Sequence, residues 1–572
     1  MRQHKNSKII FNKKEFSSNE IAMYVSAIES NLRSIFGRET FKVGILLNRS
    51  IDLFATILAV LRTNGTYILV EPTLPPSLIQ YMLDDAKVDV LVLQSSTQIN
   101  FPFTGRVIHI DNVKLEYTDF NRSLSTINHC AYIVYTSGST GKPKGVEITR
   151  KALLNFIEGI SEIIDFSPGK RIASFTAVSF DIFFLESVMA LYKGLTVVLA
   201  TEEEQHNPRF MAKLIMDNNV DMIQMTPSRI QLLLNYDKEL LCLKKVKEIM
   251  IGGEPFPPNL LRTLQEKTTA KIYNMYGPTE TTIWSTVSDV TNKDRIDIGR
   301  PIKNTEIYIV DESLSILSDG EMGEICIAGK GLAKGYVGLD DLTTEKFIRL
   351  PQNPNIRVYR TGDMGRYLPD GNIEYLGRID NQVKIRGHRI ELEEIETHIN
   401  QFDGINQSIV TVVEMSETDK VLVAFYTSDS TIEQSTIAEY LLTKLPRYMV
   451  PVVFRRVENF IQTANGKIDR KRVLECVEIN VQDSVPNIFA TSELNETQKK
   501  ALKVIISELD STIGDVTLET SFINAGIDSI TFIRIVVALE SEFGFEFDDE
   551  MLLITQFPTI KSMIEYVASK IK

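Results

Sequence analysis

The sequence has little cysteine and histidine and no long apolar run, and each shortage excludes a class of protein. Its 572 residues include four cysteines and six histidines. The cysteines lie far apart, with no C-x-x-C pair and no histidine couple nearby, which argues against a zinc site and favours a reduced, cytoplasmic setting. No stretch of eighteen apolar residues occurs, and the first residues, MRQHKNSKIIFNKKEF, lack an apolar signal region. Neither membrane insertion nor secretion is therefore expected.

Basic residues are also fewer than acidic residues, with 62 lysines and arginines against 75 aspartates and glutamates. The formal net charge is −13, and no cluster of lysine and arginine offers a surface for nucleic acid or an anionic membrane. The 43% hydrophobic content is ample for several buried cores. Small molecules and other proteins are the expected partners.

The order of apolar patterns predicts an α/β protein with several domains. Strand-like runs such as VDVLVLQ, AYIVYTS, MIQMT and EIMIGG alternate with helical patterns such as DLFATILAVLRTNG. The part of the chain before Lys42, where a lead-in to this alternating pattern is expected, largely lacks one. Near Asp370-Gly371, alternating residues and turn pairs predict hairpins that open a smaller α+β unit, which ends near Cys476.

The last part of the chain differs in character. Residues 477–491 contain Pro486 and show no helical period, so they are read as a linker. The segments ELNETQKKALKVIISELD, SITFIRIVVALESEFG and TIKSMIEYVASKIK carry apolar residues at helical spacing, which predicts a small bundle. From Glu493 to Lys572 there are 14 acidic and 7 basic residues, so much of the net negative charge lies here.

A loop that follows the apolar strand AYIV has the composition of a phosphate cradle. It reads YTSGSTGKPKG from Tyr135 to Gly145. Glycines let backbone N–H groups approach phosphate oxygens, hydroxyls donate to them, and lysines neutralise charge. The Walker A spacing fails, and Lys142 is followed by proline. Taken alone, the loop could also be a flexible glycine and serine turn.

This loop and five further segments resemble the adenylate-forming superfamily. The segments, in order, are NMYGPTETT (274–282), GEICIAG (323–329), YRTGD (359–363), GRIDNQVKIRG (377–387) and NGKIDR (465–470). Phe180-Asp181 and the acidic helical C-terminus narrow the resemblance to a nonribosomal peptide synthetase adenylation domain fused to a peptidyl carrier domain. The resemblance implies a large N-terminal core (1–379), a small mobile α+β subdomain (380–476), a linker (477–491) and an all-α four-helix carrier bundle (492–572).

The resemblance also implies a site for ATP and Mg²⁺. Catalytic roles fall to Lys467, which reaches the substrate carboxylate and the α-phosphate, and to Asp380, the hinge of the small subdomain. Glu280 matches the Mg²⁺ ligand, a hard-cation role that suits a carboxylate. Asp363 accepts from the ribose hydroxyls, and Tyr276 offers a ring to adenine. The expected ATP-binding residues are Thr136, Ser137, Gly138, Ser139, Thr140, Gly141, Lys144, Gly253, Glu254, Asn274, Tyr276, Gly277, Thr279, Asp363 and Arg378.

The implied amino-acid pocket resembles pockets that activate glycine. Asp181 would pair with the α-ammonium, although an aspartate here could instead cap the helix that follows. Phe183 departs from the family, which commonly has a small hydroxyl residue there. The pocket positions are Asp181, Ile182, Leu185, Gln224, Met250, Gly252, Met275, Ile283, Trp284 and Lys467.

A physical argument also favours a small substrate. Asp181 and Lys467 are committed to the ammonium and the carboxylate, and Leu185, Met275 and Trp284 fill the space of a larger side chain. Glycine ranks first and alanine second, because one methyl group is a small difference. Gln224 could instead hydrogen-bond a polar substrate such as serine.

The carrier prediction rests on Ser529 in the segment GIDSI. It lies at the start of an apolar-periodic helix with Asp528 as the plausible N-cap, a position that many serines occupy for structural reasons alone. The resemblance makes it the attachment site of 4'-phosphopantetheine. Gly387 would then lie beside the pantetheine tunnel, and His388 is expected to be a surface or structural histidine.

The implied reaction is ATP-dependent activation of the amino acid, followed by thioester loading onto the arm at Ser529. Expected partners are a phosphopantetheinyl transferase, a downstream condensation or acceptor protein in trans, and a small MbtH-like activator. Two alternatives stay open. An acyl-CoA synthetase would not need Asp181 or a carrier in cis, and a dead scaffold would be expected to have lost Lys467, Glu280 or Asp363.

Overall fold

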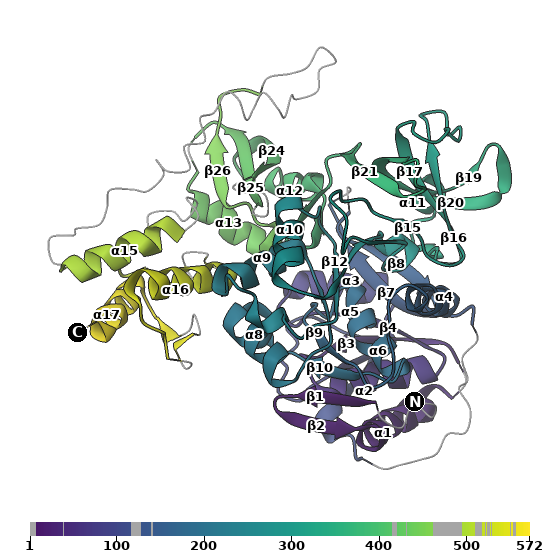
Figure 1. Cartoon of the computed structure of the whole chain (residues 1–572), viewed down its shortest axis with the longest axis horizontal. Coiled ribbons are helices and arrows are strands. Elements are labelled where there is room, and N and C mark those ends of the chain that lie inside the picture. Colours follow the sequence, from purple (N-terminus) through teal and green to yellow (C-terminus); the bar gives the residue numbers. More distant parts are fainter. Residues whose placement is uncertain are drawn as a thin grey trace. The chain divides into compact units, whose positions relative to one another are not determined.

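The computed structural model places the chain in two compact units, Met1–Glu391 and Leu392–Lys572. Figure 1 shows the elements of both units along the chain. The boundary between the units lies a short way C-terminal to the predicted subdomain boundary at 379/380. The role of Asp380 as the hinge stays a prediction. The structure describes residues 7–37, 39–115, 127–138, 141–414, 420–430, 432–460, 495–508, 518–520, 522, 527, 529–548, 551–552 and 556–571.

Two large sheets form the α/β part of the first unit and confirm the predicted fold class. The first has nine strands, and those between β10 and β13 run parallel. Its strands in spatial order are β15 (Arg300–Pro301), β14 (Thr286–Asp289), β13 (Lys271–Tyr276), β12 (Glu248–Gly252), β11 (Met222–Met225), β9 (Arg171–Ser174), β10 (Thr196–Leu199), β1 (Lys8–Phe11) and β2 (Lys14–Ser17).

The second large sheet has seven strands. In spatial order they are β18 (Gly335–Tyr336), β8 (Lys144–Thr149), β7 (Cys130–Thr136), β4 (Gly65–Leu69), β3 (Phe41–Leu46), β5 (Val90–Leu93) and β6 (Arg106–His109). The longer helices of the unit are α1 (Ser18–Phe36), α2 (Ile51–Arg62), α3 (Pro76–Asp85), α4 (Arg150–Ser161), α8 (Pro208–Asp217), α9 (Pro227–Tyr236) and α10 (Pro258–Lys267).

The segment before Lys42, which shows little of the α/β pattern in its sequence, pairs with strands and helices of the first unit. Strand β1 pairs parallel with β10, and β2 pairs antiparallel with β1. Helix α1 begins with a capping box in which the Ser17 side chain accepts from Glu20 N and the Glu20 side chain accepts from Ser17 N. The two strands and this helix form the lead-in that was predicted to be largely missing, so that prediction is wrong.

The predicted hairpin at Asp370-Gly371 is confirmed, but it does not open the smaller unit. It joins β20 (Asn353–Tyr367) to β21 (Ile373–Arg378), and both belong to a five-stranded antiparallel sheet of the first unit. Gly371 has φ +78°, a left-handed conformation that glycine adopts without strain. The other strands of this sheet are β16 (Thr305–Val310), β17 (Gly323–Gly329) and β19 (Phe347–Leu350).

The second unit begins with the predicted α+β region. It contains α12 (Leu392–Ile399), β24 (Ile405–Glu414), β25 (Lys420–Ser428), α13 (Gln434–Leu442) and β26 (Val453–Arg456). The strands form one sheet in the order β24-β25-β26. The predicted all-α region follows, and three helices lie within its described residues: α15 (Glu496–Glu508), α16 (Ser529–Phe543) and α17 (Ile560–Lys570).

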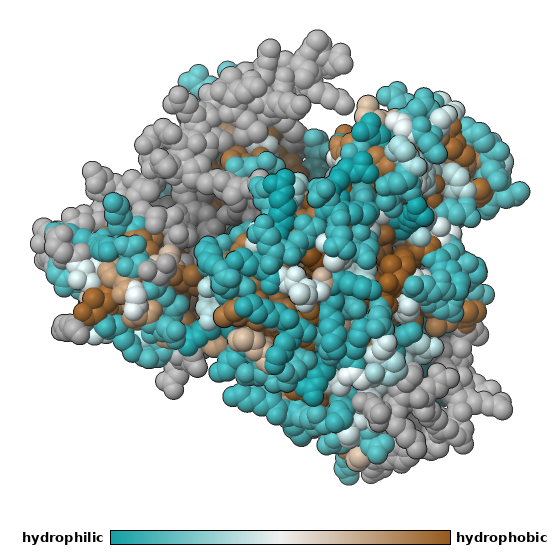
Figure 2. Space-filling view, viewed as in Figure 1, coloured by the Kyte–Doolittle hydropathy of each residue, from teal (hydrophilic) through white to brown (hydrophobic). Residues whose placement is uncertain are grey.

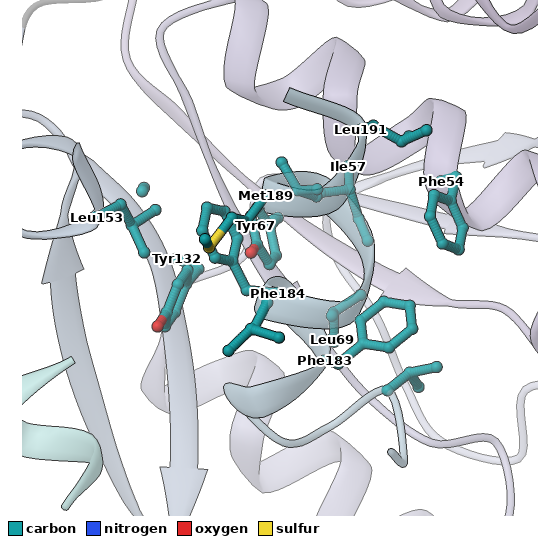
Figure 3. Packing of buried hydrophobic residues seen from close by; sticks show 14 of the residues in the cluster. Phe54, Ile57, Tyr67, Leu69, Tyr132, Leu153, Phe183, Phe184, Met189 and Leu191 are labelled. Carbon is teal, nitrogen blue, oxygen red and sulfur yellow. The ribbon is translucent and has the colours of Figure 1, made fainter. Parts of the chain in front are cut away.

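A continuous apolar core lies beneath the segment that begins at Asp181. Phe183 is buried, and its ring packs edge-on against Phe54 at a centroid distance of 5.7 Å (Figure 3). Phe183, which is larger than the residue common in the family, therefore packs in the core against α2.

The coloured face in Figure 2 is mainly hydrophilic, with smaller brown areas between the polar residues. Among the described residues, no helix combines the length and the apolar character that crossing a membrane requires.

Candidate functional site

The candidate nucleotide site lies where parallel strands of the nine-stranded sheet end. Strands β12 and β13 pair in parallel, with Gly252 opposite Met275, so their carboxyl ends meet at one edge. Ligands of open α/β sheets bind outside such strand ends. This topology brings Gly253, Glu254, Tyr276 and Gly277 to the same edge.

The described part of the glycine-rich loop is a tight turn after β7. A Cβ atom added to Gly138 would lie 2.1 Å from the carbonyl oxygen of Lys142, so no side chain fits there. Gly141 N donates to Gly138 O at 3.1 Å, and Gly141 has φ +79°. Gly138 and Gly141 are thus joined by a turn hydrogen bond. The predicted Ser139 and Thr140 lie outside the described residues.

Four of the predicted nucleotide-site and hinge residues form one hydrogen-bonded group. Asp363 accepts from the Tyr276 hydroxyl through one oxygen and from Arg378 Nη1 through the other, both at 2.6 Å. Arg378 also donates to both carboxylate oxygens of Asp380, at 2.6 and 2.7 Å. Asn274 is buried beside this group and donates to Asp297 O at 2.8 Å. Residues widely separated in the sequence therefore meet as predicted.

Glu280 is the centre of a buried charged cluster. Its carboxylate accepts from Tyr336 at 2.8 Å and from Arg389 Nη1 at 2.9 and 3.0 Å, and Lys144 Nζ lies 4.0 Å away. Burial raises the pKa of Glu280, but the charges of Arg389 and Lys144 outweigh it and lower the pKa to about 2. Burial and the nearby Arg389 lower the pKa of Lys144 to about 8. A buried, ionised carboxylate beside a glycine-rich loop fits the predicted Mg²⁺ ligand.

A hairpin formed by β22 (Val383–Ile385) and β23 (His388–Ile390) lies against this site. Gly387 N donates to Glu254 Oε1 at 2.6 Å, and Ser137 Oγ donates to Arg389 O at 2.8 Å. Gly387 has φ +83°, and an added Cβ would lie 2.9 Å from Thr226 Cγ2, so the turn requires glycine. The hairpin backbone thus contacts two residues predicted to bind the nucleotide.

His388 packs against Phe180 with ring centroids 4.9 Å apart. Burial lowers the pKa of His388 to about 3, so the ring is neutral at ordinary pH. This agrees with the prediction of a structural histidine. Arg389 was not among the predicted site residues, although it lies only two residues beyond the GRIDNQVKIRG segment. The sequence signal that could have identified Arg389 was a basic residue close to the glycine turn at Gly387.

Asp181 has the geometry of a cation-binding carboxylate. It is 8% exposed, its side chain makes no capping hydrogen bond to α5 (Ile182–Phe184), and its Oδ2 has no hydrogen-bond partner. The alternative in which Asp181 caps the helix is therefore wrong. Burial raises the pKa of Asp181 to about 6. A buried carboxylate with a free oxygen favours a cationic ligand.

The predicted apolar pocket residues belong to one hydrophobic cluster. Strand pairing places Gln224 opposite Met250, and an added Cβ on Gly252 would lie 2.7 Å from Trp284 Cη2. No space for a larger residue therefore exists at Gly252. Ile182 packs against the hydrophobic cluster that contains the other apolar pocket residues, which are Leu185, Met250, Met275, Ile283 and Trp284.

The loop that presents Trp284 is strained. Thr282 and Ile283 have φ +69° and +68°, a left-handed conformation that β-branched residues rarely adopt. Thr282 Oγ1 donates to Gly331 O at 2.6 Å, which holds the turn. Gly277 allows the close approach, because an added Cβ would lie 2.8 Å from Trp284 Cα. The fold thus maintains an unfavourable backbone at the pocket wall.

The predicted carrier serine lies in the second unit. Ser529 is the first residue of α16, which agrees with its predicted place at a helix start. Lys467 and Asp528 lie outside the described residues.

Comparison with known families gives two matches. The model described as AMP-binding enzyme matches residues 2–337, and the model described as phosphopantetheine attachment site matches residues 500–567. Both agree with the predicted order of domains. The chain therefore combines an ATP-using adenylation domain with a carrier domain that has a phosphopantetheine attachment site.

Curated relatives include large peptide synthetases. Tyrocidine synthase 3 of Brevibacillus parabrevis is 34% identical over 533 residues, which are 92% of this chain and 8% of that protein. Gramicidin S synthase 1 of Brevibacillus brevis is 34% identical over 539 residues, 93% of this chain and 48% of that protein. The chain therefore spans less than half the length of these relatives.

Solved structures with the same fold include two nonribosomal peptide synthetase proteins. One contains adenylation and PCP domains and matches with a TM-score of 0.83 at 22% identity, covering 99% of this chain and 95% of that chain. The other is a four-domain synthetase bound to AMP and glycine, with a TM-score of 0.63 at 30% identity, covering 99% of this chain and 42% of that one.

Proposed function

Because the chain belongs to the AMP-binding enzyme family and carries a phosphopantetheine attachment domain in the same polypeptide, we propose that it activates glycine as glycyl-AMP and loads it onto its own carrier. The observation that carries this proposal is Asp181, a buried carboxylate with an unpartnered oxygen beside a filled apolar pocket. The similar four-domain synthetase that was solved with AMP and glycine supports the same substrate.

In the first step, a carboxylate oxygen of the amino acid attacks the α-phosphorus of ATP and pyrophosphate leaves. Asp181 binds the ammonium group, and the backbone of the glycine-rich loop with Lys144 faces the phosphates. Glu280 would hold Mg²⁺, which supplies positive charge to the phosphate oxygens when bound. Lys467 offsets the negative charge that accumulates as two anions meet. Asp363, Tyr276 and Asn274 hold the nucleoside.

In the second step, the thiol of the phosphopantetheine arm attacks the aminoacyl carbonyl, the thioester forms and AMP leaves. The arm is attached at Ser529 by a phosphopantetheinyl transferase. Rotation about Asp380 removes Lys467 from the site between the steps, and Gly387 leaves room for the arm. The product then passes to a condensation or acceptor protein in trans, and an MbtH-like protein is a candidate activator.

Selection of glycine follows from the filled pocket. Trp284 is the only tryptophan of the chain, is 2% exposed, and contacts the position of Gly252. We expect Trp284→Ala to open space for a side chain, so that kcat/KM for alanine and serine rises relative to glycine by about tenfold or more. Pyrophosphate exchange with each amino acid measures this ratio. An unchanged ratio would contradict the filled-pocket argument.

The raised pKa of Asp181 predicts a pH dependence. Burial raises the pKa of Asp181 to about 6, so a growing fraction of the carboxyl is protonated and cannot pair with ammonium as the pH falls through this value. The KM for glycine should be constant between pH 7 and 8 and rise by about tenfold for each pH unit well below 6. Initial rates of exchange from pH 5 to 8 measure this. A KM that stays flat to pH 5 would exclude an ionised Asp181 as the ammonium partner.

An acyl-CoA synthetase is the second candidate, because such enzymes share the fold. Its acyl substrate has no ammonium, so the free oxygen of Asp181 favours the amino-acid activity. Carrier loading tests the proposal: the holo-protein is incubated with ATP and labelled glycine, and intact-protein mass spectrometry follows the added glycyl group. We expect it in wild type and not in Ser529→Ala. Label transfer to free coenzyme A, with none on the protein, would favour the synthetase.

A further inference from the structure

A buried carboxylate next to the pocket has no role in the two steps above. Glu186 follows the pocket residue Leu185 and lies in a π-helical turn, Leu185–Met189, which interrupts the helix between α5 and α6 (Ala190–Tyr192). Single π turns are frequently found at functional sites. Glu186 is 0% exposed, and its Oε2 accepts from Thr176 N at 2.9 Å while its Oε1 accepts from Thr176 Oγ1 at 2.5 Å.

Glu186 also reaches a predicted pocket residue. In the amide orientation that satisfies both of its neighbours, Gln224 Nε2 donates to Glu186 Oε1 at 3.2 Å, and Gln224 Oε1 accepts from Met225 N at 3.3 Å. The opposite orientation would set oxygen against carboxylate and N–H against N–H. A carboxylate at this position therefore selects one orientation of the Gln224 amide.

Two arginines, the buried Arg49 and the partly exposed Arg229, hold the surroundings of Glu186 in place. Arg49 donates to Thr176 O at 2.6 Å and to Ala200 O at 2.7 Å, and Arg229 donates to Phe175 O at 2.9 Å. They fix the backbone of the segment whose Thr176 binds Glu186. Their positive charges also compensate the buried carboxylate.

We propose that Glu186 is a positioning residue that locks the Gln224 amide and thereby makes this wall of the pocket unable to adapt to a side-chain hydroxyl. The inference rests on the proposed function and refines its substrate selection. Gln224 could hydrogen-bond serine, but the fixed amide has only one N–H and one lone pair left, and a hydroxyl that does not lie in line with either would need the amide to reorient. Reorientation breaks the contacts with Glu186 and Met225, which leaves buried groups mispaired.

A double-mutant cycle tests the coupling. In Glu186→Gln the side-chain shape is kept, but its amide N–H₂ can face Gln224 and reverse that amide. We expect KM for glycine to rise by about tenfold and the serine-to-glycine ratio of kcat/KM to rise by a similar factor, since a buried hydrogen bond is exchanged for a mispaired one. KM for ATP should stay unchanged. In a Gln224→Leu background, the same substitution should change KM by less than about twofold, because the coupled partner is gone.

Glu248→Gln is the matched control, since Glu248 is a second buried glutamate, located in β12 of the nine-stranded sheet, and its Oε1 lies 3.2 Å from Lys170 Nζ. It should leave the serine-to-glycine ratio unchanged. Equal effects of Glu186→Gln in both backgrounds would overturn the proposal and leave a purely structural role. The cycle is measured with whichever amino acid gives the strongest exchange, so a substrate other than glycine would refute the proposed function without hiding the coupling.

Discussion

Asp181→Asn should reduce kcat/KM for glycine by about a hundredfold to a thousandfold, the loss expected when one partner of a buried ion pair is removed. The substitution keeps the shape of the side chain and removes only its charge. Asp181 Oδ2 has no hydrogen-bond partner among the described residues, so no internal hydrogen bond to that oxygen is lost in the substitution. The measurement is glycine-dependent pyrophosphate exchange at saturating ATP.

Two readouts separate loss of ammonium binding from general damage. The dissociation constant of ATP, measured by calorimetry without amino acid, should be the same in wild type and Asp181→Asn. The melting temperature of the variant should not fall below that of wild type, because an uncompensated buried charge has been removed. A variant with wild-type KM for glycine would show that another group binds the ammonium.

Lys467→Ala should nearly abolish adenylation, with a fall in exchange of about a hundredfold or more, the size found when one charge-stabilising group is removed from a transition state. The physical reason is the meeting of two anions, the amino-acid carboxylate and the α-phosphate. The proposal assigns Lys467 to the first step alone. Loading from chemically prepared glycyl-AMP should therefore proceed at a rate close to wild type.

The two half-reactions of the same variant are each other's control. A comparable loss in both would contradict the separation of steps about Asp380. Retained exchange in Lys467→Ala would show that Lys144 or Arg389 supplies the needed charge. These outcomes can be read from one protein preparation.

Much of the fold could be predicted because the local patterns were strong. The strand-like runs VDVLVLQ, AYIVYTS, MIQMT and EIMIGG form β5, β7, β11 and β12. The segment DLFATILAVLRTNG contains most of α2, whose N-cap Ser50 accepts from Leu53 N. The strands before Lys42 could not be assigned, because β1 and β2 are four residues long and only β1 pairs with the distant β10, while β2 pairs with β1. Short strands carry little periodicity, and tertiary pairing decides their structure.

The site was predictable where a motif places residues at strand ends. Asp363, Tyr276 and Arg378 meet as expected, although 87 residues separate the first two in sequence. Arg389 and Glu186 were missed for a different reason. Their roles depend on which groups face them in space, namely Glu280 for Arg389 and Gln224 for Glu186, and spacing along the chain contains no information on such contacts.

The most direct test of the central claim is amino-acid-dependent exchange of labelled pyrophosphate into ATP across all twenty amino acids. The account predicts the strongest exchange with glycine, a slower reaction with alanine, and loss of exchange in Lys467→Ala. Strongest exchange with a bulky or charged amino acid would contradict the filled pocket around Trp284, and no exchange with any amino acid would contradict the proposed activity itself.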